Sequence, residues 1–257
     1  MLGVLMADKF IEPFTKTVQY YLKYRPSYPK QVLDLLVNEC GLNKNSVIAD
    51  IGSGTGLLAK LFLDVGNTVY GVEPNQAMRE AGEVYLAQYS QFHSISGTAE
   101  ETHLENASMD FITAGTAFHW FDVEKTKREF KRIAKPKAWV VLVWNVRDTQ
   151  SPLICDYESL LLEYGKDYAD SNAKKLDKVA MDTFFSDQTI KTASLRNVQQ
   201  FDWEGFKGRL LSMSFIPGPE NEKYTAMLEQ LKQIFLRYEK NGIIKFLYKT
   251  NLYYSHI

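Results

Sequence analysis

A glycine-rich turn between a short apolar segment and a helical pattern is the feature that most constrains this chain. Residues 47–51 form an apolar run that predicts a buried strand, and the apolar residues of 57–65 recur at helical spacing. Between them lie Gly52, Gly54 and Gly56. Glycines at a strand-to-helix turn let the backbone turn tightly and approach a ligand closely. The chain is therefore expected to bind a ligand where its first strand ends.

The first 145 residues continue this alternation of strands and helices. We expect strands at 47–51, 68–72, 92–96, 110–114 and 139–143, and helices at 32–40, 57–65, 74–88 and 122–133. The continuous apolar run at 139–143 is typical of a parallel strand that is buried on both faces. Such alternation predicts an open α/β sheet with right-handed crossovers, whose ligands bind at the carboxyl ends of the strands.

The pattern changes after residue 150. We expect a helix at 151–163, a polar stretch at 166–178, a strand at 198–203, helices at 203–214 and 219–240, and a last strand at 243–254. Two helices between two late strands predict a small helical cap, whose apolar residues fit a core slightly better than a pocket lining. We predict one domain over 1–257, with an N-terminal lid and helix (1–45), a cofactor-binding core (46–150) and a C-terminal part that carries the cap (151–257).

Composition narrows the class of protein. The chain has 257 residues, of which 30 are Lys or Arg and 31 are Asp or Glu, so it lacks the basic excess of a dedicated nucleic-acid binder. Its two cysteines, Cys40 and Cys155, exclude a disulfide framework and fit a reducing, cytoplasmic compartment. No apolar run is long enough to span a membrane, and no cluster has metal-ligand spacing. We expect a small-molecule partner and no nucleic acid, membrane or metal; the sequence indicates no oligomeric state.

The spacing of the glycines and the charge beside them limit which ligand the turn can bind. A dinucleotide fingerprint that starts at Gly52 needs a glycine where Leu57 stands, and one that starts at Gly54 finds only Ala59, which fits a looser ending. The lysine of a phosphate-binding P-loop is missing. Asp50, just before the turn, would repel a pyrophosphate and favours a ligand with an ammonium or sulfonium group. The turn thus favours S-adenosylmethionine as the ligand. The interpretation as a dinucleotide site is weakened but stays open.

A second acidic residue follows the next expected strand. Glu73 lies 23 residues after Asp50, at the end of the strand at 68–72. A carboxylate there can accept hydrogen bonds from both hydroxyl groups of a ribose. The alternative is a structural acid at the start of the next helix, near Asn75. Folds that bind NAD and folds that bind S-adenosylmethionine share the ribose role, so Glu73 does not separate the two cofactors.

Taken together, these segments resemble the class I S-adenosylmethionine-dependent methyltransferases of the type 11 small-molecule group. The resemblance rests on the segments VIADIGSGTG (47–56), GVEPNQAM (71–78) and GTAE (97–100). The segments YRPSYP (24–29) and TAFHWF (116–121) are similar to those of trans-aconitate methyltransferase-like proteins. The strong similarity covers residues 20–145. It implies a Rossmann-like, mostly parallel sheet of seven strands, whose last strand is antiparallel and lies between the fifth and the sixth.

The resemblance also implies the cofactor S-adenosyl-L-methionine and its contacts. The glycine turn would cradle the methionine part, Asp50 would hold its amino group, and Met78 would pack on the adenine. Related proteins often carry an acidic residue where this chain has Thr98. On charge grounds, Arg25 can supply the cation that the cofactor carboxylate needs, although a surface role fits it too. The expected cofactor-binding residues are Arg25, Asp50, Gly52, Ser53, Gly54, Thr55, Gly56, Glu73, Pro74, Asn75, Met78, Thr98, Ala99, Glu100 and Thr116.

The methyl acceptor leaves more than one mechanism open. Methyl transfer is an in-line displacement that depends on alignment. A carboxylate acceptor needs no general base, and Arg147 and Arg209 could clamp it, although both also fit a solvated surface. A phenol or amine acceptor would need His119 as a base, and Tyr24 and Trp120 are expected beside the acceptor. We predict a small-molecule methyltransferase, with a carboxylic acid as the suggested acceptor; the alternatives are a non-catalytic S-adenosylmethionine-binding protein and a methyltransferase of macromolecules.

Overall fold

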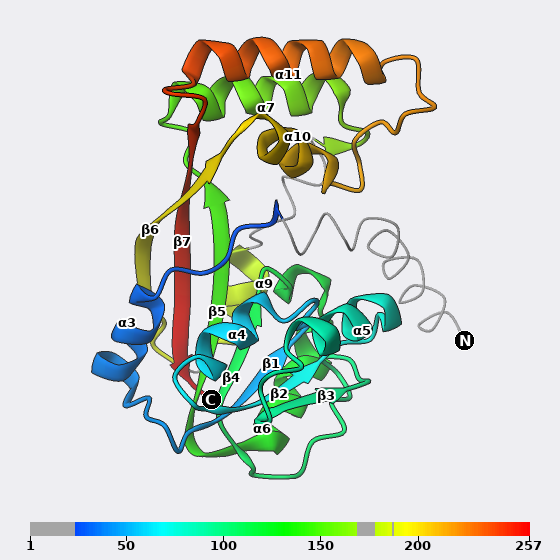
Figure 1. The fold of residues 1–257 in the computed structure, drawn as a ribbon. Coiled ribbons are helices and arrows are strands. Elements are labelled where there is room, and N and C mark those ends of the chain that lie inside the picture. Colours follow the sequence, from blue (N-terminus) through cyan, green and yellow to red (C-terminus); the bar gives the residue numbers. More distant parts are fainter. Residues whose placement is uncertain (1–23, 169–177, 187) are drawn as a thin grey trace.

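A twisted sheet of seven strands forms the centre of the molecule (Figure 1). The computed structural model describes residues 24–168, 178–186 and 188–257. The strand order is β3-β2-β1-β4-β5-β7-β6. The strands are β1 (Val47–Ile51), β2 (Thr68–Val72), β3 (Phe92–Ile95), β4 (Met109–Gly115), β5 (Ala134–Arg147), β6 (Lys191–Phe201) and β7 (Ile244–His256). Strand β7 pairs antiparallel with both β5 and β6, and the other pairs are parallel, which confirms the expected fold class.

Helices cover both faces of this sheet and build a separate layer beyond it. They are α3 (Gln31–Cys40), α4 (Leu57–Leu63), α5 (Gln76–Tyr85), α6 (Val123–Ile133), α7 (Pro152–Tyr164), α9 (Lys178–Phe184), α10 (Trp203–Leu211) and α11 (Tyr224–Tyr238). Side chains cap three of them at the first turn. The carboxylate or amide oxygens of Asn75, Asp122 and Asp202 accept backbone N–H groups at the starts of α5, α6 and α10. Such caps stabilise a helix by about 1 kcal/mol each.

Side chains of the central strands point alternately to the two faces of the sheet and form an apolar core on each face. Ile48 and Val141 pack with α3 and α4 on one face, whereas their neighbours Ala49 and Leu142 pack with α6 and α9 on the other. Successive side chains of a strand point to opposite faces, so a strand that is apolar at every position is buried on both. These two cores fix the sheet, and with it the positions of the carboxyl ends of β1, β2 and β4.

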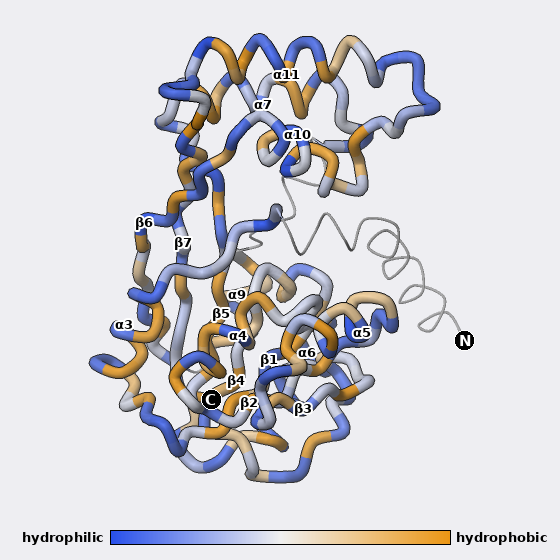
Figure 2. The backbone as a smooth tube through the Cα atoms, viewed as in Figure 1, coloured by the Kyte–Doolittle hydropathy of each residue, from blue (hydrophilic) through white to orange (hydrophobic). Residues whose placement is uncertain are grey.

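A third core holds the cap, which consists of α7, α10 and α11 (Figure 1). These helices lie at the far end of the long strands β5, β6 and β7. Helix α11 alternates between hydrophilic and hydrophobic stretches along its length, and its buried side chains are Met227, Leu231, Ile234 and Phe235 (Figure 2). Phe206 and Leu210 of α10 are fully buried in this core. The apolar residues of the cap therefore form a core.

The structure differs from the expected elements mainly in the C-terminal half. Strand β6 begins at Lys191, seven residues before the expected start. Its first half lies at the edge of the sheet and alternates exposed and half-buried residues, so it lacks the apolar run from which we predicted strands. Strand β5 extends to Arg147 because β7 pairs with it along nine residues. Helix α9 lies where no element was expected. The predicted lid residues 1–23 and most of the polar stretch 166–178 lie outside the described residues.

Candidate active site

The glycine turn connects β1 to α4 in a conformation that only glycine adopts readily. Gly52, Gly54 and Gly56 all have positive φ, at 66°, 56° and 80°. A Cβ added to Gly52 would lie 2.7 Å from Cβ of Ala117, and one added to Gly56 would lie 2.5 Å from Cδ1 of Leu86. The turn is thus held against its surroundings on two sides, and Gly56 is needed for packing of the turn.

Asp50 is buried at the carboxyl end of β1, immediately before this turn. One of its oxygens, Oδ1, accepts the Thr113 hydroxyl at 3.1 Å, whereas Oδ2 has no hydrogen-bond partner among the described residues. Burial raises the pKa of Asp50 to about 7, and the negative charge of Glu73 acts in the same direction, while the hydrogen bond from Thr113 opposes both. A buried carboxylate with a free oxygen is incomplete, and a cationic ligand would complete it.

Glu73 at the end of β2 is bound to the glycine turn itself. Its Oε2 accepts the backbone N–H of Gly54 at 2.8 Å, and its Oε1 accepts that of Asn75 at 2.9 Å. Burial raises its pKa, and these two hydrogen bonds oppose the rise. Each carboxylate oxygen can accept more than one hydrogen bond, so Glu73 keeps capacity for ribose hydroxyl groups. Asn75 caps α5, and the buried Met78 reaches to 3.3 Å from a Cβ placed on Gly54.

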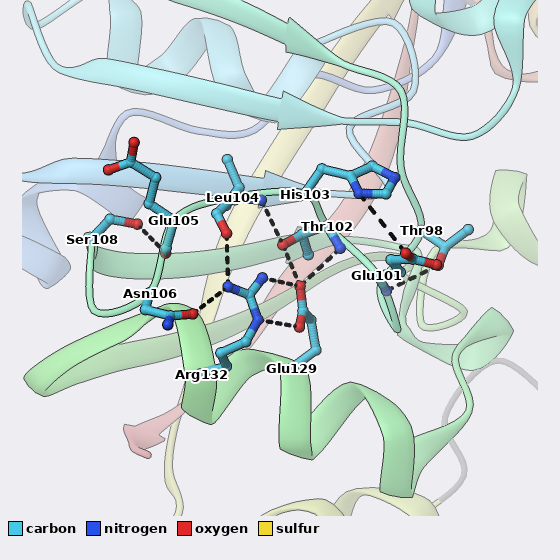
Figure 3. A network of polar contacts seen from close by, with 10 residues as sticks. All are labelled: Thr98, Glu101, Thr102, His103, Leu104, Glu105, Asn106, Ser108, Glu129 and Arg132. Atoms are coloured by element: carbon cyan, nitrogen blue, oxygen red, sulfur yellow. Dashed lines mark hydrogen bonds and ion pairs between the residues drawn. The ribbon is translucent and has the colours of Figure 1, made fainter.

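The loop after β3 is held by the helix that follows β4 (Figure 3). Glu129 of α6 accepts the N–H and hydroxyl of Thr102, at 2.8 and 2.5 Å, and pairs with Arg132 at 2.6 Å. Arg132 donates in turn to the backbone oxygen of Leu104 and the side chain of Asn106. These contacts fix the segment that follows Thr98, Ala99 and Glu100, three of the expected cofactor-binding residues.

The expected residues just before that segment are held by the protein itself. Thr98 accepts the N–H of Glu101, and Ala99 is buried in the core. The Glu100 carboxylate accepts the backbone N–H of Asp122, at the start of α6, at 2.8 Å. Glu100 therefore ties the loop to α6 in this structure, a contact that local sequence spacing cannot indicate because its partner is 22 residues away.

A cavity of about 500 Å³ opens between the glycine turn and the cap. Nine of the residues expected from sequence line it: Arg25, Asp50, Gly52, Ser53, Gly54, Thr55, Thr116, Arg147 and Arg209. The others do not line it: Tyr24, Gly56, Glu73, Pro74, Asn75, Met78, Thr98, Ala99, Glu100, His119 and Trp120. The volume suits a small organic ligand.

The wall of the cavity at the cap is positively charged. Arg209 of α10 is only 2 % exposed, and it donates to the hydroxyl groups of Tyr248, at 2.9 Å, and Ser212, at 3.3 Å. No carboxylate pairs with Arg209 within the described part of the chain. A nearly buried guanidinium with only neutral partners is ready to accept an anion, because burying an unpaired charge is costly.

Arg147 differs from Arg209 because a carboxylate of the protein already compensates its positive charge. It forms an ion pair with Glu158 of α7 and donates to the Tyr168 hydroxyl, which donates to Glu158 at 2.5 Å. Burial lowers the pKa of Arg147, but Glu158, Tyr168 and Tyr157 together outweigh burial and raise it. The two arginines expected to clamp the acceptor thus both reach the cavity, but Glu158 already compensates the charge of one.

An N-terminal segment, residues 24–28, passes between the cap helices and the rest of the molecule (Figure 1), and its Arg25, Pro26 and Tyr28 line the cavity. Arg25 donates to the backbone oxygen of Ser212 in the cap. The Tyr28 hydroxyl lies 3.5 Å from the Thr116 hydroxyl and would be 2.5 Å from a Cβ on Gly115. Arg25 is thus well placed for an anion in the cavity.

The residues after β4 are divided between the cavity and its surroundings. Thr116 lines the cavity and has a positive φ of 55°, a strained conformation that is often found at functional sites. His119 lies in a short 3₁₀ turn, where its ring contacts that of the half-exposed Trp120 with a 4.7 Å separation between centroids. Neither lines the cavity, so the catalytic role of His119 stays a prediction.

Sequence reasoning missed several residues of the cavity wall, which come from β5, β7 and the segment 24–28. These are chiefly Tyr28, Trp144, Asn145, Tyr248, Asn251 and Tyr253. The spacing of the tyrosines in the last strand was the available signal for these residues. Whether those tyrosines reach the cavity depends on the antiparallel register, which places Arg147 opposite Tyr248. In the described ranges, no cluster of side chains fits a metal ion and no helix has the length and apolarity needed to cross a membrane.

The residues present fit S-adenosylmethionine. Asp50 offers an unpartnered carboxylate oxygen for an amino group, and the positive φ of Gly54, 56°, is one that glycine adopts without strain. The Thr55 hydroxyl and the Trp144 indole N–H are also buried without partners among the described residues, and both residues line the cavity. Buried polar groups without partners indicate ligand positions, because each costs about 1–3 kcal/mol when unpaired.

Comparison with known proteins agrees with this geometry. Residues 49–142 match the model of a methyltransferase domain. The chain is 26% identical to an uncharacterized methyltransferase-like protein of Schizosaccharomyces pombe, over 97% of this chain and 98% of the relative. It is 33% identical to an uncharacterized methyltransferase of Mycobacterium tuberculosis, over 52% of this chain and 53% of the relative.

Solved structures share the fold at low sequence identity. A candidate type II methyltransferase from Anaeromyxobacter dehalogenans has a TM-score of 0.63 at 17% identity and covers 91% of this chain and 97% of its own. The YcgJ protein of Bacillus subtilis has a TM-score of 0.55 at 20% identity and covers 89% of this chain and 98% of its own. The matched domain, the relatives and the site together support an S-adenosylmethionine-dependent methyltransferase, and the solved structures share its Rossmann-like fold.

Proposed function

We propose that this methyltransferase transfers a methyl group to the carboxylate oxygen of a small organic acid. The observation that carries the proposal is Arg209, a buried guanidinium without a carboxylate partner in the described chain, which lines the same cavity as Asp50. A carboxylate binds well to a guanidinium through charge-assisted hydrogen bonds. The similarity to trans-aconitate methyltransferase-like proteins points to the same class of acceptor.

The charges of the cavity divide it into two ends with opposite preferences. Asp50 at the end of β1 favours the cationic amino group of the cofactor, and Arg25 and Arg209 on the side of the cap favour anions. When bound, S-adenosylmethionine supplies a methyl group that its positively charged sulfur activates. The protein then needs mainly to bind the acid, orient it and exclude water, which can contribute several kcal/mol to lowering the barrier.

A carboxylate acceptor also fits a cavity wall in which the described residues include no histidine. A carboxylic acid is already ionised at neutral pH, so no group has to remove a proton before the transfer. The cavity wall contains Tyr28, Tyr248 and Tyr253 but no histidine. His119 would be needed for a phenol or an amine and lies outside this wall.

The remaining site assignments belong to the same proposal. Asp50 and the glycine turn would hold the methionine part, Glu73 the ribose, and the segment Thr98–Glu100 the edge of the adenine. Arg25 and Thr116 would complete the cofactor site, and Arg209 would bind the acceptor. A cytoplasmic setting fits the cysteines, since Cys40 and Cys155 are both free thiols in the described structure.

The test is methyl transfer from labelled S-adenosylmethionine to a panel of small mono- and dicarboxylic acids, with their amides, phenols and amines as controls. We expect label in a product that mild alkali hydrolyses to methanol, as a methyl ester requires. Label on nitrogen or on a phenol would overturn the carboxylate proposal. Binding of S-adenosylhomocysteine without transfer to any acid, protein or RNA would favour the non-catalytic alternative, and label in protein or RNA alone would favour the macromolecular one.

A further inference from the structure

Two buried side chains meet where the parallel strands β1 and β4 are paired. Asp50 of β1 and Thr113 of β4 are direct partners in the register of the two strands. The Thr113 hydroxyl lies 3.1 Å from Oδ1 of Asp50 and 3.3 Å from the backbone oxygen of Ala49. A hydroxyl carries one proton, so Thr113 divides its donation between these acceptors and leaves Oδ2 of Asp50 without a partner in the described chain.

Thr113 stands out from its own strand because it is polar in an apolar setting. Its neighbours Ile112 and Ala114 are fully buried hydrophobic residues, and Thr113 is itself fully buried. A valine would fill almost the same volume without a hydroxyl to satisfy. Because a buried hydroxyl is costly unless it is hydrogen-bonded, its presence here points to the bond it makes with Asp50.

The charge on Asp50 depends on a small number of groups. Burial, with a smaller contribution from the carboxylate of Glu73 at the end of β2, raises its pKa to about 7. The hydrogen bond from Thr113 of β4 lowers it, and the nearby backbone N–H of Ala59 in α4 acts in the same direction. Glu73 is the one charged group that acts on Asp50 among the described residues, so no cation of the protein keeps Asp50 ionised.

We propose that Thr113 is a positioning residue for the cofactor: its hydroxyl holds one oxygen of Asp50, favours the ionised carboxylate and leaves the second oxygen for the amino group. The proposal rests on the proposed role of Asp50 in binding that amino group. Without the hydroxyl, Asp50 would bind its proton more tightly, and the ammonium group of the ligand would have to displace it. Thr113 would then set the lowest pH at which the cofactor binds well.

The experiment measures binding by isothermal titration calorimetry between pH 6 and pH 8, with two ligands. S-adenosylhomocysteine carries the amino group, and 5′-methylthioadenosine lacks the whole amino-acid part and serves as an internal control. The variants are Thr113→Val and Thr113→Ala, which remove the hydroxyl, and Thr113→Ser, which keeps it. Thr126→Val is the matched control, because Thr126 is fully buried on α6 and its hydroxyl has no partner among the described residues.

For the wild type, we expect affinity for S-adenosylhomocysteine to fall about tenfold per pH unit below pH 7, and affinity for 5′-methylthioadenosine to stay constant. Thr113→Val and Thr113→Ala should weaken S-adenosylhomocysteine about tenfold or more at pH 7, since a hydrogen bond to a charged group is lost. They should also move the acidic limb of the profile to higher pH. Thr113→Ser should restore both properties, and Thr126→Val should change neither.

Two results would overturn the proposal. One is an equal loss of affinity for both ligands in Thr113→Val and Thr113→Ala, which would show that Thr113 only supports the fold of the site. The other is an unchanged pH profile in both variants. If the wild type itself bound neither ligand, the proposed cofactor site would be wrong, and this inference would fall with it.

Discussion

Arg209 of the cap and Tyr248 of β7 are joined by a hydrogen bond of 2.9 Å from Nε to the phenol oxygen, and both line the cavity. Tyr248 in turn stands opposite Arg147 in the ladder of β5 and β7. The pair therefore connects the helical layer to the strands that continue to the cofactor end of the sheet. The hydrogen bond holds a buried positive charge at the cavity wall without neutralising it.

Replacing Arg209 by methionine tests this charge. We expect Arg209→Met to raise the KM for a carboxylic acid acceptor by about 10- to 100-fold, because charge-assisted hydrogen bonds contribute about 1.5–3 kcal/mol. The affinity for S-adenosylhomocysteine should not change. Initial-rate kinetics and calorimetry check both expectations. The matched control is Arg237→Met, since Arg237 pairs with Asp156 on the outside of the cap and is 63% exposed. An unchanged KM in Arg209→Met would contradict the anion role.

Asp50→Asn should stabilise the free protein and abolish cofactor binding. The folded pKa of Asp50 is about 7, against an ordinary value of 3.8, so between these pH values the folded state holds a proton that the unfolded state has lost. Stability therefore falls as pH rises from about 4 to 7, and asparagine removes this loss. We expect a gain on the order of 1–4 kcal/mol at pH 8 and little at pH 4.

Urea unfolding at the two pH values measures the effect of Asp50→Asn. Asp110→Asn is the contrasting variant, because Asp110 is paired with Lys135 at 2.8 Å and accepts the backbone N–H of Val47. Its replacement should lower stability at pH 8. Retained binding of S-adenosylhomocysteine by Asp50→Asn would show that this carboxylate does not hold the amino group.

Ionised Glu129 is expected to stabilise the fold, so its contribution rises with pH, whereas that of Asp50 falls. Burial alone would raise its pKa, but hydrogen bonds from Arg132 and Thr102 outweigh it and lower the pKa to about 2. Its contribution is complete above the ordinary pKa of 4.5 and is lost as pH falls through about 2. The lost free energy should be about 3 kcal/mol. Glu129→Gln should therefore be clearly less stable than the wild type at pH 7 and nearly equal to it at pH 2, as measured by urea unfolding.

Gly52→Ala should damage the glycine turn more than its small size suggests. Gly52 has a φ of 66°, and an added Cβ would lie 2.7 Å from Ala117. A positive φ costs a non-glycine residue about 1–2 kcal/mol before any clash is counted. We expect lower thermal stability and loss of binding to S-adenosylhomocysteine. Gly242→Ala has a similar φ and open space around it, so it should lower stability alone. Equal effects of the two variants on binding would argue against a cofactor role for Gly52.

The sequence predicts those parts of the site that depend on local spacing. Asp50, the glycine turn and Glu73 follow successive strands, so their common edge follows from the α/β pattern. Arg147 is different, because Glu158 of α7 compensates its charge and Tyr168 accepts a hydrogen bond from it, and both lie far from it in sequence. Local patterns carry no information on such pairings.

The edge strand β6 and the cap also depend on long-range contacts that local sequence patterns do not indicate. The first half of β6 alternates in a way that also fits a polar loop, and only its ladder with β7 makes it a strand. The cap helices were predictable because each carries an apolar face, yet the sequence does not indicate which of their polar residues reach the cavity. Arg209 does so because α10 packs beneath α7 and α11 against the ends of the long strands.

The long strands β5 and β7 have a consequence for how this enzyme could acquire a new acceptor. One continuous ladder runs from Trp139, paired with His256 at the amino end of the apolar part of β5, past the level of Asp50 to Arg147, paired with Tyr248 in the wall of the cavity. Neighbouring positions on such a ladder face different surroundings. Selectivity for the acceptor could therefore be redesigned by exchanging side chains at the cap end of these two strands, while Asp50 and Glu73, which we propose bind the methyl donor, remain untouched.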